Sequence, residues 1–428
     1  MLKIFSSLRY CLLLFSLFLS TLLSAQIKII SPYSRFGIGD LSGINNAWNF
    51  SMGGTGIAFR SPTHINYLNP ASYTEFDSTS FVFEGGVLMN SIQLKSNIQS
   101  VSRNYASLGY LLFGFPVNHW WKTSIGLFPF SNVGYNIAIT ELHDDIGKVK
   151  RSYTGEGGIN RFNWGNGFQI TRSLSIGFNA SYLFGNSNRR SAVLFPDSIM
   201  FMNFMVDHDI TVNDFYFDFG AQYRIKLKKD MSMVLGGIFS PKSAVSAKAN
   251  TLARTFVLAS DLSETIKDTI NISDDVHGKI VVPLSLGFGL SFEKQDRWVI
   301  GGDFKWQNWK NYTAFDITDS LVNSYQFNFG AEIQPDVNAY TNYLKRIHYR
   351  FGFNYTSTYL ELRGKHLNDY AFSLGFGLPV HGSKTAVNLG LQVGSRGTLE
   401  SNLIKETYFK FVLGFSIYER WFVKRKYF

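Results

Sequence analysis

Cysteine and proline are scarce in this sequence, which has 428 residues but only 1 cysteine and 10 prolines. The cysteine, Cys11, lies in an apolar run over residues 10–24. Lys3 and Arg9 precede that run and Ala25 follows it, a pattern typical of a secretory signal peptide. We therefore predict that residues 1–25 are cleaved off. The mature chain then has neither a disulfide framework nor thiol chemistry.

Long hydrophobic runs are also missing. After residue 25 no apolar stretch approaches the ~18 residues that a transmembrane helix needs. A chain without such a helix can cross a membrane only as a closed β-barrel, because every backbone polar group must find a partner within the lipid. Export together with this absence favours an outer-membrane protein of a Gram-negative cell. Export also argues against nucleic acid as a partner, although the formal net charge is +10.

Motifs of catalysis and cofactor binding are absent as well. GGTG at 53–56 lacks the Gly-Lys-Ser/Thr that completes a phosphate-binding loop. The sequence contains no GxSxG elbow and no HExxH pair. The runs at 143–145 and 207–209 combine histidine with aspartate, but such runs are more often solvated loops than metal sites. We predict no enzyme, no cofactor and no metal site.

Glycine and aromatic residues are abundant: 38 Gly, 40 Phe and 22 Tyr. Several segments alternate strictly between apolar and polar residues, among them 174–184, 298–308 and 347–355. Period-2 alternation with one apolar face predicts half-buried β-strands.

Two folds accept such strands, a soluble sandwich and a transmembrane barrel. The polar faces carry charged side chains in mid-strand, which a sandwich core tolerates poorly. In a barrel those faces line the lumen, and the charges there are Asp303, Lys305, His348 and Arg350. Tryptophans such as Trp120, Trp298 and Trp309 fall near strand ends, where aromatic girdles form. We therefore predict an all-β fold, an antiparallel transmembrane barrel of about fourteen strands. An ion-pair network that ties a plug to the wall is the alternative role of the lumen charges.

The connections alternate in length, as they do in outer-membrane barrels. Short turns are predicted at 118–122, 171–173, 227–230, 293–297 and 380–384. Long connections are predicted near 141–157, 186–208, 255–275, 310–320, 359–369 and 396–406, and 334–346 is a longer connection on the short-turn side. The predicted strands cover 80–97, 103–117, 121–140, 157–171, 174–188, 209–228, 231–256, 266–292, 297–310, 321–334, 346–358, 369–379, 385–396 and 406–419.

Residues 26–79 precede the first strand and are too irregular to be strands themselves. The lumen of a fourteen-strand barrel is too wide for side chains alone to fill. We therefore predict that 26–79 is a plug inside a barrel formed by 80–428. The turns of this plug would be SMGGTGIA and LNPA, and its key residues Met52, Gly53, Gly54, Thr55, Gly56, Asn69, Pro70 and Ala71.

The sequence resembles the FadL family of outer-membrane channels. The resemblance rests on SMGGTGIAFRSPTHINYLNPA (51–71), on VPLSLGFGLSFEKQDRWVIGGDFKWQNWKNY (282–312) and on the terminal strands with HYRFGFNY, LGFGLPV and KFVLGFSI. YSRFGIGDL (33–41) resembles the opening of one subgroup. The resemblance implies a fourteen-strand barrel, an N-terminal hatch and sideways exit of apolar substrates through a kinked third strand. The acidic hatch residues of the family are replaced here by Phe59, Arg60 and Ser61.

The predicted third strand carries a candidate kink in GLFPFSNVGYNI (126–137), at Pro129, Phe130 and Gly134. Proline cannot donate to the ladder, so a bulge or gap is expected there. A simple bulge without a gating role is the alternative.

Two functions follow as hypotheses. The first is passive uptake of hydrophobic, fatty-acid-like molecules, with plug displacement and lateral exit. The second is an accessory or shuttle barrel of an outer-membrane secretion or assembly complex, which grips a protein partner with its extracellular loops. The segment FPDSIMFMNFMV (195–206) fits either, as a roof over a ligand or as a partner surface, through Phe201, Met202, Phe204 and Met205. We expect a monomeric barrel in contact with lipid and lipopolysaccharide.

Overall fold

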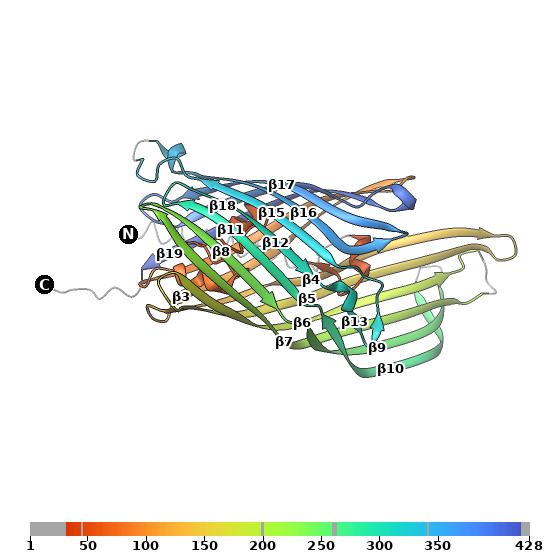
Figure 1. The fold of residues 1–428 in the computed structure, drawn as a ribbon. Coiled ribbons are helices and arrows are strands. Elements are labelled where there is room, and N and C mark those ends of the chain that lie inside the picture. Colours follow the sequence, from red (N-terminus) through yellow and green to blue (C-terminus); the bar gives the residue numbers. More distant parts are fainter. Residues whose placement is uncertain (1–30, 44–45, 198–200, 259–262, 340–341, 421–428) are drawn as a thin grey trace, which may run out of the picture.

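The computed structural model describes residues 31–43, 46–197, 201–258, 263–339 and 342–420. The predicted signal peptide lies outside the described residues. Within those ranges no helix has both the length and the apolar character needed to cross a membrane. The described chain is dominated by β-strands, which wind into one antiparallel barrel (Figure 1).

Fourteen strands form the closed wall, so the predicted fold class is confirmed. The last strand pairs with the first, from Arg420 opposite Ser80 to Lys405 opposite Lys95. This pairing closes the hydrogen-bond ladder, as a barrel in lipid requires. In order around the barrel the strands are β2 (Ser80–Lys95), β3 (Ser100–Pro116), β4 (Trp121–His143), β5 (Gly147–Gln169), β6 (Leu174–Leu194), β7 (Asn203–Lys228), β8 (Met231–Ser240), β11 (Ser285–Lys294), β12 (Trp298–Gln307), β15 (Ser324–Ile333), β16 (His348–Leu362), β17 (Lys365–Pro379), β18 (Ala386–Arg396) and β19 (Lys405–Arg420).

The two faces of the wall differ as the alternation predicts. Large aromatic side chains such as Phe215, Phe288 and Phe372 are 60 to 64% exposed on the outer face, where lipid would cover them. Inward-facing positions such as Asn179 and Ser291 are buried and polar. The prediction that Trp309 belongs to an aromatic girdle at the lipid interface is wrong. Trp309 is 1% exposed, because it packs in an apolar cluster and stacks on Tyr359.

Two predicted strands, 231–256 and 266–292, are each two strands. β8 ends before Pro241, and the chain then forms the hairpin of β9 (Ser243–Leu258) and β10 (Glu264–Val282) before Pro283. Neither proline has an N–H to continue a ladder, so each allows the chain to change direction. The wall itself continues from β8 directly to β11, with Ser240 opposite Ser285.

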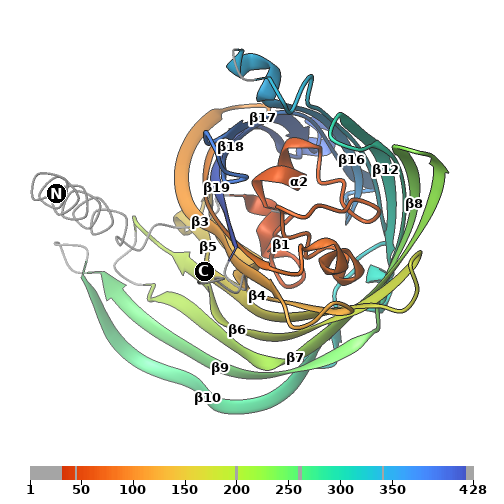
Figure 2. The same cartoon turned by 90° about the vertical axis from the view of Figure 1, so that its left-hand side faces the viewer.

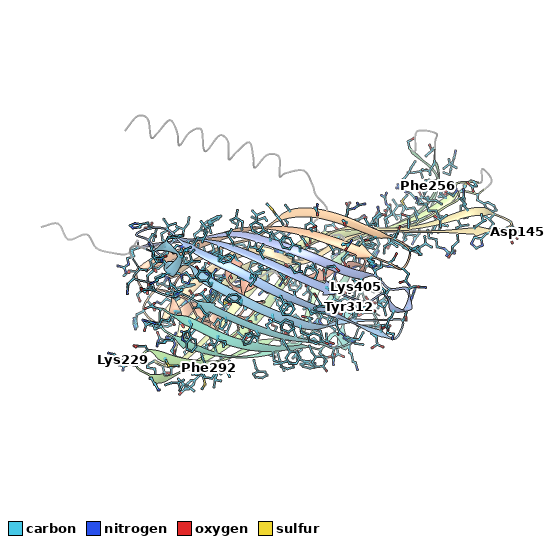
Figure 3. The ribbon with its side chains drawn as sticks, turned by 90° about the horizontal axis from the view of Figure 1, so that it is seen from above. Asp145, Lys229, Phe256, Phe292, Tyr312 and Lys405 are labelled. Carbon is cyan, nitrogen blue, oxygen red and sulfur yellow. The ribbon has the colours of Figure 1, made fainter. Side chains whose placement is uncertain are left out.

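The hairpin extends the sheet beyond the barrel, because β9 pairs with the first half of β7 while β8 pairs with its second half. Together with the protruding ends of β4 to β7 it forms a lobe at one end of the molecule. Figure 3 shows Asp145 and Phe256 on this lobe and Lys229 at the opposite end. All five predicted short turns lie at the end with Lys229, and short turns of outer-membrane barrels face the periplasm, so we expect this end to be periplasmic and the lobe end extracellular.

Four predicted long connections are wrong. Residues 359–369 belong to β16 and β17 except for Arg363 and Gly364, and the other three connections are 141–157, 186–208 and 255–275. Most of these residues extend β4, β5, β6 and β7 or belong to the β9–β10 hairpin. Backbone pairing within the lobe satisfies their N–H and C=O groups, which a loop would leave to water.

The N-terminal small elements lie inside the barrel, and the others lie in connections at its two ends. The view along the barrel shows the N-terminal elements surrounded by strands (Figure 2). They are the 3-10 helix η1 (Pro32–Arg35), the short strand β1 (Asp40–Leu41), the helix α2 (Ala47–Ser51) and the 3-10 helix η2 (Pro70–Glu75). The remaining short elements are η3 (Trp309–Asn311), β13 (Thr313–Ala314), β14 (Ile317–Thr318), η4 (Tyr343–Arg346) and η5 (Glu400–Asn402).

Candidate functional site

The N-terminal segment, which we define as the described part of residues 31–79, fills the lumen with polar contacts of its own. Asn46 caps α2: its side-chain oxygen accepts from the backbone N–H of Asn49 at 2.9 Å. The Asn46 amide also donates to Ile65 O at 2.9 Å and to the Glu84 carboxylate on the wall at 2.8 Å. A five-residue helix has little intrinsic stability, so these contacts determine where it forms.

The glycine turn that follows α2 lies directly on the wall. Gly53 and Gly54 have positive φ angles of 66° and 79°. Gly53 lies against Gly352 of β16, and Met52 is fully buried between the segment and the wall. Side chains at Gly53 or Gly352 would hold the two backbones apart, so glycine is required on both sides of this contact.

A buried carboxylate anchors the same turn. One Asp303 oxygen, Oδ2, accepts the backbone N–H groups of Gly56 at 2.7 Å and Ile57 at 2.9 Å. Asp303 is 6% exposed, and its second oxygen has no hydrogen-bond partner in the described structure. Charge-assisted bonds of this kind are stronger than neutral ones. Asp303 therefore ties the segment to β12.

A second contact between the segment and the wall combines ion pairs with aromatic stacking. Glu332 on β15 accepts from the Trp48 indole at 2.9 Å, from Arg350 Nε at 2.6 Å and from His348 at 3.1 Å. The Trp48 ring stacks on His64 with 5.2 Å between centroids. Of the four lumen charges, Asp303 and Arg350 contact the segment directly, Arg350 at 3.4 Å from His64 Nε2, whereas His348 bonds only Glu332 of the wall. Lys305 shares their face but forms no ion pair within the described residues.

The LNPA turn makes a third anchor. The Asn69 amide donates to Ile57 O at 2.7 Å and to Ala221 O of β7 at 3.2 Å. Asn69 Oδ1 accepts from Ala71 N at 3.1 Å, which starts η2 at Pro70. A Cβ on Gly220 would lie 2.1 Å from Asn69 Oδ1, so a glycine in the wall makes room for this turn.

Next to the segment, the wall separates between β3 and β4. Their pairing begins at Pro116 opposite Lys122 and stops at Leu111 opposite Leu127. Each strand has a β-bulge near this point: Gly109 is the extra residue of β3, and Phe130 is the extra residue of β4. Bulges bend a strand and end regular pairing, so the two strands diverge from here toward the lobe.

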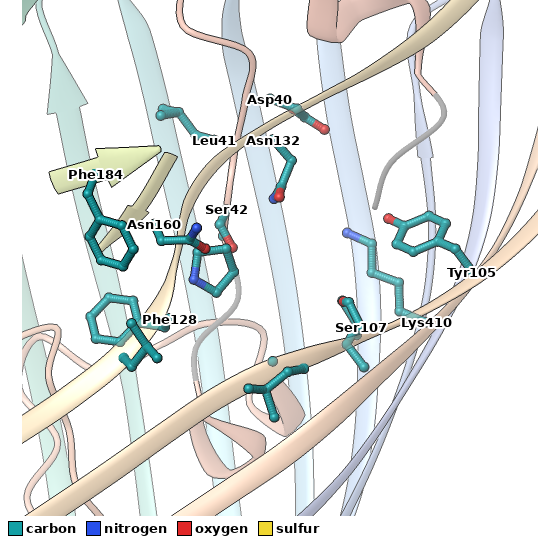
Figure 4. A pocket seen from close by; sticks show the side chains of 16 residues that line it. Asp40, Leu41, Ser42, Tyr105, Ser107, Phe128, Asn132, Asn160, Phe184 and Lys410 are labelled. Atoms are coloured by element: carbon teal, nitrogen blue, oxygen red, sulfur yellow. The ribbon is translucent and has the colours of Figure 1, made fainter. Parts of the chain in front are cut away.

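A cavity of about 250 Å³, which we call the lateral pocket, lies at this separation. Its apolar lining residues come from β3, β4 and neighbouring strands. Its polar lining residues have side chains that point into the barrel (Figure 4). Leu108 and Leu127, on either side of it, are 54% and 37% exposed on the outer face. The other lining residues are Asp40, Leu41, Ser42, Gly43, Leu88, Tyr105, Ser107, Gly109, Phe128, Pro129, Asn132, Asn160, Phe184 and Lys410.

The N-terminal segment occupies the β4 edge that β3 leaves. In β1, Asp40 and Leu41 pair with Asn132 and Ser131. Ser31 N donates to Gly134 O at 2.8 Å, so Gly134 also takes part in this contact. Of the three residues predicted at the kink, Pro129 lines the pocket, Phe130 forms the bulge and Gly134 bonds the segment.

Arg396 on β18 holds β1 in this place. Its guanidinium lies 2.7 Å from Asp40 and 2.7 Å from Glu406, which is 1% exposed. Ser31 donates to the same Glu406 carboxylate at 2.6 Å. Burial raises the pKa of the nearby Tyr33 to about 12, so its hydroxyl keeps its proton and donates to Ile404 O at 2.5 Å.

A sequence model of one family, BamG, matches residues 6–428. The chain belongs to the BamG family. No curated protein matches the sequence.

Solved structures resemble this BamG-family chain in fold. The toluene transporter TodX of P. putida is 15% identical with a TM-score of 0.61, over 90% of this chain and 100% of its own. The toluene transporter TbuX of Ralstonia pickettii is 13% identical with a TM-score of 0.57, over 87% and 97%. A FadL homologue of Pseudomonas aeruginosa is 11% identical with a TM-score of 0.57, over 89% and 99%. The predicted likeness to FadL-type barrels is thus confirmed as a likeness of fold.

The loop residues predicted to contact a ligand or partner lie on the lobe of this BamG-family chain, away from the lateral pocket. Met205 is buried with Ala192 and Phe256, and Phe204 lies beside it in β7. Phe201 and Met202 are 44% and 53% exposed. Residues 198–200 of the same stretch lie outside the described part of the chain.

Several residues of the site carry no signal that sequence reasoning detected. Gly109 becomes a bulge only through its register with β2, whereas the sequence suggested a bulge or gap at Pro129 and Phe130. Glu84 and Glu332 are inward positions, but which part of the N-terminal segment they meet depends on the fold. Within the described residues no cluster of three or more metal-binding side chains occurs.

Proposed function

We propose that this chain is an outer-membrane channel for small hydrophobic molecules, with the N-terminal segment as its plug and the β3–β4 separation as a lateral exit. The observation that carries the proposal is the lateral pocket, because it lies where the wall itself is not hydrogen-bonded. A cavity of about 150 Å³ accepts benzene, so the pocket is large enough for a monoaromatic molecule. The exposed Leu108 and Leu127 would lead such a molecule to the lipid.

The plug need not leave the barrel as a whole in this mechanism. Its glycine and LNPA turns are bonded to β7, β12 and β16, whereas β1 pairs with the wall at only two positions. Movement of β1 away from β4 would join the pocket to the lumen. Such opening requires no covalent chemistry, only two positions of one short segment.

A variant without the bulges at Gly109 and Phe130 tests whether the β3–β4 separation is the exit. Deletion of Gly109 and of Phe130 leaves the alternation of both strands intact and gives them regular registers with β2 and β5. We expect β3 and β4 then to pair beyond Leu111, which closes the pocket. Uptake of labelled toluene by cells or liposomes that carry the double-deletion variant should fall several-fold, toward the level without protein.

The matched control is deletion of Leu227, the extra residue of a third bulge, at the periplasmic end of β7. The Leu227 deletion variant should take up labelled toluene at the same rate as the natural chain. Folding of each variant is checked by its heat-dependent mobility in gel electrophoresis. Unchanged toluene uptake by a folded double-deletion variant would contradict the lateral exit.

The lobe favours a second function, that of a barrel which binds a protein partner outside the cell. On β10, Ile266, Ile270 and Ile272 are 53, 58 and 60% exposed, although the lobe stands beyond the wall that lipid covers. Exposed apolar patches of this kind mark interaction sites. Purification from native membranes with and without residues 242–283 tests it: a partner protein should be retained only by the complete chain. Toluene uptake that persists without any retained protein would count against this second function.

A further inference from the structure

The periplasmic end of the barrel opens into a second cavity, of about 1160 Å³, which we call the vestibule. Its floor is the underside of the N-terminal segment, with Arg60 and Glu75. Its rim is made by the periplasmic connections, including the β7–β8 turn at Lys229 (Figure 3). The vestibule does not share a lining residue with the lateral pocket.

The rim is rich in cations that have no counter-ion. Six of them come from three successive connections of the wall. Within the described residues none of the six forms an ion pair: Lys226, Lys228, Lys229, Lys294, Arg297 and Arg346. Only three lining carboxylates are similarly unpaired there, Asp230, Asp296 and Glu419. The rim therefore presents a surplus of positive charge to the periplasm.

The rim is held in a fixed arrangement by bonds between the connections. Gln295 N donates to Asp230 O at 2.9 Å, which joins the β11–β12 turn to the β7–β8 turn. Gln334 N donates to Arg297 O at 2.7 Å, and the Gln334 side chain donates to Arg346 O at 3.0 Å. These bonds hold the three connections together before any ligand arrives, which lowers the cost of binding.

The floor is equally fixed, and its charges are already satisfied. Glu75 lies 2.9 Å from Arg60 and 2.9 Å from Arg224, and Arg224 lies 3.4 Å from Glu293. Because these four side chains neutralise one another, the attraction for an anion comes from the rim. The six unpaired cations follow one another along three connections that are bonded side by side, so they form a row on one part of the rim.

We propose that the vestibule binds an acidic peptide segment of a periplasmic protein. A cavity larger than the ~300–1,000 Å³ of small-ligand sites holds several residues of chain. Carboxylates spaced along that chain match the row of cations on these three connections.

The test uses a fluorescein-labelled oligoglutamate peptide and the full chain in nanodiscs of neutral lipid. We expect saturable binding by fluorescence anisotropy at about 0.1 M salt, where the Debye length is about 10 Å, and loss of binding at about 1 M, where it is about 3 Å. Charge reversal at the rim, Lys228→Glu/Lys229→Glu/Arg297→Glu, should raise Kd on the order of tenfold or more, because repulsion replaces attraction.

The matched control reverses three exposed lysines at the extracellular end, Lys267→Glu/Lys279→Glu/Lys310→Glu, and changes the net charge equally. Retained affinity in this control and lost affinity in the rim variant support the site. Equal losses in both variants, or no binding at low salt, overturn it. Competition by inorganic phosphate as effective as that by the peptide also overturns it, in favour of a small-anion site. Toluene uptake does not enter this test, so its result is separate from that of the lateral exit.

Discussion

Gly53 of the N-terminal segment and Gly352 of β16 are in direct backbone contact: a Cβ on Gly352 would lie 2.0 Å from Gly53 N. The reciprocal Cβ on Gly53 would lie 2.7 Å from the backbone of Phe353. No flexible side chain can move aside here, because both neighbours are main chain. The contact therefore fixes the depth at which the segment lies in the lumen.

Substitution Gly352→Ala should displace the glycine turn and destabilise the plugged state by about 1–3 kcal/mol, the usual cost of overpacking. Hydrogen exchange at Met52 to Thr55 is the measurement, and we expect it to accelerate. The control is Gly237→Ala on β8, where an added Cβ meets nothing within 4 Å. Equal exchange in the two variants would show that the contact does not hold the turn.

Removal of the Asp303 carboxylate should also release the glycine turn, here through the loss of hydrogen bonds and not through overpacking. In Asp303→Ala, the buried N–H groups of Gly56 and Ile57 lose their acceptor, at a cost of about 1–3 kcal/mol for each group left unsatisfied. Asp303→Asn keeps an acceptor oxygen and should lose less. Limited proteolysis of the N-terminal segment measures the difference, and a ranking with Asn worse than Ala would refute this role.

Glu75 makes the packing of the N-terminal segment against the wall sensitive to low pH. Burial alone would raise its pKa, but Arg60 and Arg224 outweigh burial and hold the pKa below its usual 4.5. A carboxyl with a depressed folded-state pKa stabilises the fold above its unfolded pKa, and this contribution is lost as pH falls through the folded value. Docking of η2 should thus be independent of pH near neutrality and weaken below about pH 4.5. Hydrogen exchange of η2 against pH measures this, and in Glu75→Gln that pH dependence should largely disappear.

Arg396 should control the position of β1. In Arg396→Met, the buried Glu406 and the paired Asp40 lose their cation, and breaking a buried pair in this way costs about 3–5 kcal/mol. We expect β1 to detach from β4 and toluene uptake to rise. Arg363→Ala is the control, since Arg363 bonds only exposed carbonyls of η5. Uptake unchanged in a folded Arg396→Met variant would mean that β1 does not limit passage.

Local alternation explains why the wall was predictable. Within about ten residues, the alternation of apolar and polar side chains shows which face of a strand is which. Fourteen strands and their inward charges can therefore be predicted from the sequence. The β9–β10 hairpin was missed because alternation continues on both sides of Pro241 and Pro283, and only pairing shows that the chain has left the wall. The bulge at Gly109 is a property of register between strands, which no single segment encodes, whereas Pro129 indicated a bulge or gap beside Phe130. For the same reason the sequence indicated that Asp303 faces the lumen but not which backbone groups it binds.

The direct passage from β8 to β11 has a consequence for how this family can vary. Since Ser240 already stands opposite Ser285, the ladder of the wall is complete whether the hairpin is long, short or absent. Val245, Ala247, Ile280 and Val282 at the base of the hairpin stay bound to the core cluster with Tyr33 and Ile38. The exposed remainder of β9 and β10 is decoupled from the hydrogen bonding of the wall, so natural selection can reshape this end of the protein while the wall stays constant.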